Sequence, residues 1–275
     1  MRTLMTLAVL ALAGAIAGGI AIYLGVYNVA ATEDHFRVTR LVLDAAMRQS
    51  IRSRSDDIAV PALDEPAMVE RGLHIYRMHC VQCHGAPGVA PEPFALGLTP
   101  APANLAYTAR EWPPAELYWV IKHGVRMTGM PPWEFRLTDA ELWAVTAFLL
   151  KLPTLSPREY QVLISQASTQ SLPAAPDVMQ PVAADPKRGK AAMGQYACST
   201  CHEIPGVAGA NAPVGPPLTE MASRQFIAGV LPNTPQNMIR WLRAPQKIDP
   251  LTAMPNLGVT ERDARDMTAY LYTLK

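Results

Sequence analysis

The sequence has almost no net charge and few aromatic residues. Lys and Arg number 24 against 23 Asp and Glu, a formal net charge of +1. This balance produces no overall field toward nucleic acid or anionic lipid, so a nucleic-acid partner is not expected. Aromatic residues make up only 7% of the chain whereas Pro occurs 26 times, which favours short helices joined by proline-bearing loops. The length suggests about one to three domains.

Cysteine is also scarce, and all four cysteines lie in two copies of the pattern Cys-x-x-Cys-His. The residues of the two copies are Cys80, Cys83, His84, Cys198, Cys201 and His202. In this pattern the two thiols bond to the vinyl groups of a haem and the adjacent imidazole binds its iron. The alternatives are a redox dithiol, a disulfide framework, or a zinc site built from the four thiols, and the zinc site leaves both histidines without a role. The pattern therefore predicts two covalently attached haems c, with the cysteines as attachment points and His84 and His202 as iron ligands.

One long apolar run is present, from Leu4 to Tyr27. As a helix it would span about 36 Å, enough to cross a bilayer at a tilt. A cleaved signal peptide has a shorter apolar core, although the small residues at 29–31 offer a cleavage site as the alternative. We expect residues 1–30 to be a retained single-pass anchor in a bacterial inner membrane. Arg2 would stay cytoplasmic, and the haem-binding residues would be periplasmic.

The remainder divides into a stalk, two similar units and a linker. Residues 31–62 are polar and mixed in charge, which predicts a solvated helical stalk or a partner-docking segment. Residues 63–152 and 186–275 each contain one motif, a later Met-Pro pair and a final helix opened by Thr, at nearly constant spacing. We therefore expect the two units to have the same fold. Residues 153–185 are rich in Pro, Ala, Ser and Gln and are expected to be the linker, with a short helix around 159–164.

An iron bound by one histidine needs a second axial ligand or an open position. A thioether raises the reduction potential and closes the iron to other ligands. Met130 and Met254 are the candidates because each precedes a proline that stiffens its loop. Met127 and His123 are the rivals to Met130. The iron-bound imidazole also needs a backbone carbonyl for its other nitrogen, expected from Pro216 in the second unit and Pro102 in the first.

At these motifs the sequence resembles class I c-type cytochromes in a membrane-anchored dihaem arrangement. Residues 215–218, Gly-Pro-Pro-Leu, resemble the Gly-Pro-x-Leu loop of mitochondrial-type cytochromes c. Residues 252–258 look like the ligand loop of cytochrome c domains attached to haem–copper oxidases. The first unit lacks Gly-Pro-x-Leu and looks like the small cytochrome c modules of dihaem electron-transfer subunits. The resemblance implies an all-α fold, an N-terminal transmembrane helix followed by two tandem cytochrome c domains.

The resemblance also implies a function in one-electron transfer. The first hypothesis is a tethered carrier and not an enzyme, relaying electrons from a quinol-oxidising complex or dehydrogenase toward a terminal oxidase, as a subunit of a respiratory complex. The second is a dihaem peroxidase, which needs one iron able to open for peroxide. The axial ligand of the first haem distinguishes the two. A third hypothesis is an anchoring subunit of a larger complex.

Overall fold

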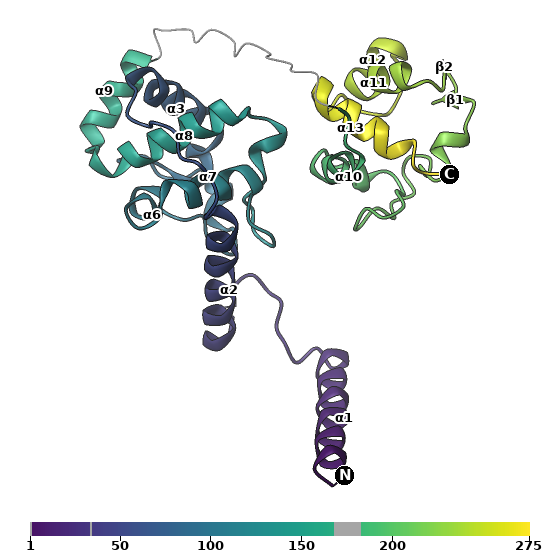
Figure 1. Ribbon diagram of the computed structural model, residues 1–275, viewed down its shortest axis with the longest axis horizontal. Helices are drawn as coiled ribbons and strands as arrows, with labels where there is room; N and C mark the ends of the chain where they lie inside the picture. Colours follow the sequence, from purple (N-terminus) through teal and green to yellow (C-terminus); the bar gives the residue numbers. More distant parts are fainter. Residues whose placement is uncertain (1, 34, 168–182) are drawn as a thin grey trace.

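The computed structural model describes residues 2–33, 35–167 and 183–275, and 58% of the structure is helical. Strand structure in these residues is confined to β1 (Phe226–Ile227) and β2 (Leu231–Pro232), a short antiparallel pair. The prediction of an all-α protein is therefore confirmed. Figure 1 shows the N-terminal helices followed by two helical units. The middle of the expected linker, residues 168–182, lies outside the described residues.

The N-terminal part holds α1 (Arg2–Tyr23) and α2 (Arg37–Ser55). The helices of the first unit are α3 (Pro66–His79), α4 (Val81–His84), α5 (Pro93–Leu96), α6 (Leu105–Glu111), α7 (Pro114–His123), η1 (Trp133–Phe135), α8 (Asp139–Lys151), η2 (Leu152–Thr154) and α9 (Pro157–Ala167). Those of the second unit are α10 (Pro186–Gln195), η3 (Cys198–Thr200), η4 (Met221–Ser223), α11 (Pro235–Arg243), α12 (Pro245–Ile248) and α13 (Glu261–Leu271).

Each unit contains a close crossing of two helices at a glycine. In the first unit α3 meets α8 at Gly72, where an added Cβ would lie 2.0 Å from the carbonyl oxygen of Ala144. In the second, α10 meets α13 at Gly189, where an added Cβ would lie 1.9 Å from the carbonyl oxygen of Asp266. Only a residue without a side chain permits such an approach. Because α3 and α10 each lead into a Cys-x-x-Cys-His motif, the crossings position both motifs.

Threonine caps begin the second helix of each crossing. Thr138 Oγ1 accepts a hydrogen bond from the backbone N–H of Glu141, and the Glu141 carboxylate accepts one from the Thr138 N–H at 2.8 Å. This capping box starts α8, as the sequence predicts. Thr260 Oγ1 accepts from the N–H of Asp263 at 3.1 Å and caps the start of α13.

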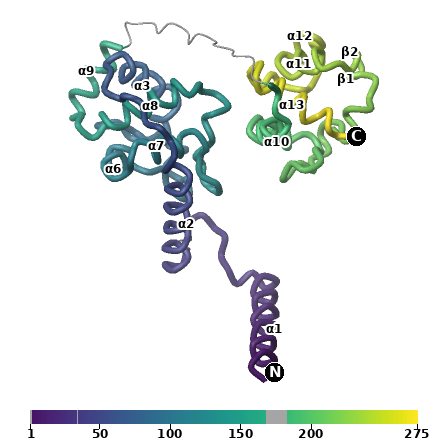
Figure 2. The backbone as a smooth tube through the Cα atoms, viewed as in Figure 1, coloured from purple at the N-terminus to yellow at the C-terminus, as the bar shows by residue number. Residues whose placement is uncertain are grey.

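By length and composition, α1 is the one helix of the described residues that is long and apolar enough to cross a membrane. A signal sequence near the N-terminus meets the same criterion. The following helix, α2, is not fully solvated. Ile51 is buried, Arg52 lies 3.6 Å from Glu116 of α7, and the Arg48 guanidinium lies 5.1 Å from the ring centroid of Trp112. The backbone trace in Figure 2 passes from α2 directly into the first unit, so the end of the expected stalk is part of that unit's packing.

Part of the expected linker is also packed. Residues 157–167 form α9, which contains the expected short helix and contacts α3. Tyr160 and Ala167 on this helix are buried and belong to the same apolar cluster as Leu73 and Phe148. We therefore propose that the first unit extends to Ala167.

Candidate functional site: two separate Cys-x-x-Cys-His motifs

The first motif joins α3 to α4. Cys80 ends α3, and the short helix α4 carries the rest of the motif through His84. The His84 Nδ1 lies 2.7 Å from the carbonyl oxygen of Ala103, so the prediction of Pro102 is wrong by one residue. The buried hydroxyl of Tyr76 donates a hydrogen bond to the Gly85 carbonyl at 2.6 Å and fixes the chain just after the motif. The Ala103 carbonyl therefore orients the His84 ring, and Tyr76 holds the backbone beside it.

The second motif lies on η3 and the turn that follows α10. The His202 Nδ1 lies 2.8 Å from the carbonyl oxygen of Pro216, which confirms the predicted partner. Gly215 lies directly against the imidazole. A Cβ at this position would be 2.5 Å from His202 Cε1 and 2.7 Å from Nδ1. The Gly215 N–H donates to the Cys201 carbonyl at 2.7 Å, which draws the Gly-Pro-Pro-Leu loop onto the motif.

His84 and His202 each form their hydrogen bond to a backbone carbonyl through Nδ1, which leaves Nε2 as the nitrogen available to a metal. Burial lowers the pKa of His84, although its bond to the Ala103 carbonyl acts in the opposite direction. A lowered pKa favours the neutral imidazole that iron requires. The donor set at each motif therefore fits a covalently attached haem, with two sulfurs and one oriented imidazole.

The surroundings of the thiols differ from those of a redox dithiol or a shared zinc site. Burial raises the pKa of Cys80 to about 12 and that of Cys198 to about 11, whereas reactive dithiols have lowered values. All four cysteines are unpaired, and the described residues contain no cluster of three or more His, Cys, Asp or Glu side chains that could hold a metal. The zinc and disulfide alternatives therefore find no support in the geometry.

The two Met-Pro loops share a turn that sequence analysis did not identify. Thr128 Oγ1 accepts a hydrogen bond from the Met130 N–H at 3.0 Å, and Thr252 Oγ1 accepts one from the Met254 N–H at 3.3 Å. Both methionines are partly buried. The repeated spacing Thr-x-Met-Pro was the available signal, since Thr hydroxyls commonly bond the backbone two residues on.

The two rivals of Met130 differ from it in their surroundings. The side chain of Met127 is 90% exposed, and its backbone has φ of 60° in the left-handed region. His123, the last residue of α7, has its Nδ1 3.7 Å from a carboxylate oxygen of Glu134. The interaction with His123, with help from Arg188, holds the pKa of Glu134 below its usual value.

A cavity of about 540 Å³ lies between α11, α12 and the chain after Met254. Its walls include Ile239, Arg240, Arg243 and Val259, and no residue of either motif lines it. The cavity is therefore not where the motif chemistry takes place, and the site is defined by the donor atoms themselves.

Comparison with known proteins identifies both units. Residues 67–149 match the family model described as cytochrome c oxidase, cbb3-type, subunit III, and residues 186–275 match the model described as cytochrome c. The chain is also similar to a cytochrome c oxidase subunit 2 of Alkalihalophilus pseudofirmus, with 29% identity over 147 residues. This match covers 52% of the chain and 40% of the relative, so the chain spans less than half of that relative's length.

Proposed function

Since the chain carries two cytochrome c domains in tandem, we propose that it is a membrane-tethered electron carrier with two covalently attached haems c. The observation that best supports this proposal is that both motif histidines have the same hydrogen-bonding arrangement. His84 and His202 each have Nδ1 held by a backbone carbonyl and Nε2 left for iron. A haem bound in this way supplies an iron that exchanges one electron.

In this proposal the chain's own residues attach, orient and enclose the group. The thioether bonds come from Cys80 and Cys83 in the first domain and from Cys198 and Cys201 in the second. The Thr-x-Met-Pro turns present Met130 and Met254 as sixth ligands, because the Thr hydroxyl and the following Pro restrict the loop around each sulfur.

With His and Met on both irons no coordination position is open, so we propose a carrier and not an enzyme. The peroxidase alternative is not supported, since the matching family models describe cytochrome c domains. The names of the matching model and relative favour an oxidase as the electron acceptor. We propose a quinol-oxidising complex or dehydrogenase as the donor, α1 as a retained anchor with its N-terminus in the cytoplasm, and both haem domains in the periplasm.

Three measurements test the proposal. A pyridine haemochrome assay should return two covalently held haems per chain, and one or none would contradict it. Magnetic circular dichroism in the near infrared should show a methionine–iron band from both haems, reduced in Met130→Ala and unchanged in Met127→Ala. If Met127→Ala removes the band instead, the assignment of the first sixth ligand is wrong. Purification in mild detergent should also yield the protein together with haem–copper oxidase subunits.

A further inference from the structure

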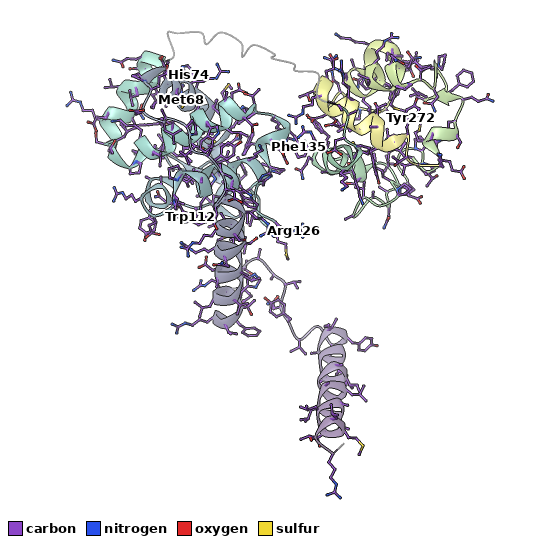
Figure 3. All side chains as sticks on the ribbon, viewed as in Figure 1. Met68, His74, Trp112, Arg126, Phe135 and Tyr272 are labelled. Carbon is purple, nitrogen blue, oxygen red and sulfur yellow. The ribbon has the colours of Figure 1, made fainter. Side chains whose placement is uncertain are left out.

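The segment Trp133–Arg136, called the docking segment below, belongs to the first unit and contacts the second. Phe135 is only 4% exposed, and it is part of the second unit's apolar cluster together with Tyr196 and Met267. Figure 3 shows Phe135 at the side of the first unit that faces α10. The guanidinium of Arg188 on α10 lies 5.2 Å from the centroid of the Phe135 ring.

Polar contacts surround this ring. The Tyr196 hydroxyl lies 3.2 Å from the Phe135 carbonyl oxygen. The Arg136 side chain donates to the carbonyl of Gln195 at 3.2 Å, and its guanidinium lies 5.5 Å from the Tyr196 ring. Glu134 lies 3.7 Å from Arg188, which is itself held by buried carboxylates of α13. An apolar centre with a polar rim is the usual anatomy of a specific interface.

Both ends of this contact reach a haem-attachment motif. On the first unit, the Trp133 ring lies 4.9 Å from the ring of His79, which directly precedes Cys80. On the second, Tyr196 is two residues before Cys198. The docking segment also follows Met130 by a few residues, so it continues the loop that carries the first candidate sulfur ligand.

We propose that the docking segment locks the two cytochrome c domains together and thereby sets the path for electron transfer between the two haems. This inference rests on the proposed function, because it needs a haem at each motif. The partner of the surface is the α10–Tyr196 face of the same chain. Phe135 and Arg136 are positioning residues: they hold the domains in place and touch neither set of donor atoms.

Spin-label distances in the full-length protein in detergent test the docking. Nitroxides are attached to cysteines introduced by Lys151→Cys in α8 and Gln246→Cys in α12, both at exposed positions away from the contact. The irons are kept reduced so that they are diamagnetic. If haems occupy the native cysteines, two labels bind per chain; more than two would contradict the proposed function and not the docking.

The parent protein should give one narrow distance distribution. Phe135→Ala should broaden it, because removing the buried ring lowers the ratio of docked to undocked protein by on the order of 100-fold, or about 2.8 kcal/mol. Arg136 is exposed, so Arg136→Ala should leave each domain folded. It should broaden the distance distribution less than Phe135→Ala does. Phe94→Ala, which removes a largely exposed ring from the same unit, is the matched control and should leave it narrow. A broad distribution in the parent, or a narrow one in both interface variants, overturns the proposal.

Electron transfer provides the second readout. A ruthenium photosensitiser on the cysteine of Lys151→Cys delivers an electron to the first domain, and absorbance then follows equilibration with the second haem. Phe135→Ala should slow this phase by about ten-fold or more, since the docked fraction limits the rate. Phe94→Ala should not slow it. Equal rates in Phe135→Ala and the parent would refute the proposed path even if both haems remain bound and reducible.

Discussion

Gly215→Ala provides a direct test of how the second imidazole is oriented. The glycine touches the His202 ring, and its backbone is not in the left-handed region, so alanine introduces a steric conflict without backbone strain. The added Cβ would lie 2.5 Å from His202 Cε1, so the ring and the loop must separate by about 1 Å. A displacement of this size carries the bond from His202 Nδ1 to the Pro216 oxygen, now 2.8 Å, beyond hydrogen-bonding range.

Two magnitudes follow. Overpacking of this kind costs about 1–3 kcal/mol in the free energy of unfolding. The carbonyl makes the imidazole a stronger donor to iron, which favours the oxidised state, so loss of the bond should raise the reduction potential of the second haem. If about 1 kcal/mol of the hydrogen-bond energy distinguishes the two oxidation states, the rise is about 40 mV.

The measurements are a potentiometric titration and thermal unfolding of the full chain. Both haems should stay attached, because the thioether cysteines are unchanged. One of the two midpoint potentials should rise while the other stays fixed. Gly194→Ala, where an added Cβ meets nothing within 4 Å, is the control in the same unit. Equal potentials and stabilities in Gly215→Ala and the control would refute the role given to Gly215.

Two predictions concern the first unit. Gly72→Ala should destabilise it by about 3 kcal/mol, because the new Cβ would lie 2.0 Å from the Ala144 oxygen, whereas Gly97→Ala has open space around it and should be near neutral in chemical denaturation. Burial acts to raise the pKa of Glu141. Hydrogen bonds from Thr138 and from Arg71 outweigh this effect and hold the pKa below its usual value. The stability this carboxylate contributes is present above its unfolded pKa and is lost as the pH falls through the folded one. Glu141→Gln should therefore cost about 1 kcal/mol at neutral pH. The difference from the parent should begin to shrink as the pH falls to about 4 and should vanish below the lowered folded pKa; a constant difference would contradict this.

The candidate site residues were predicted from patterns that repeat along the sequence. The two Cys-x-x-Cys-His motifs and the two Met-Pro loops are local patterns, and each fixes its own geometry over a few residues. The Pro216 carbonyl was also predicted, because Gly-Pro-x-Leu is a recognisable loop. The prediction for the first unit was wrong by one position, Pro102 instead of Ala103, because the corresponding loop has no such pattern. Every residue has a backbone carbonyl, so residue type alone does not indicate which one accepts the hydrogen bond.

Packing of the polar segments was not predicted. Residues 31–62 and 153–185 have the composition of solvated chain, yet Ile51 and Tyr160 are each only 2% exposed. One buried apolar side chain in a polar helix produces no periodic pattern, so hydrophobic periodicity could not identify it. The burial of Phe135 was even harder to predict from the sequence. Its partners lie about 60 residues away in the chain, and the residues around Phe135 form no pattern that indicates a contact with them.

The glycine crossings have a consequence for how the protein matures. Each unit has its own crossing, and each crossing leads into its own pair of cysteines. Under the proposed function, a substitution that forces one crossing apart should therefore reduce haem attachment first in its own unit. The mass of the chain would report such a loss, because each attached haem adds a fixed increment.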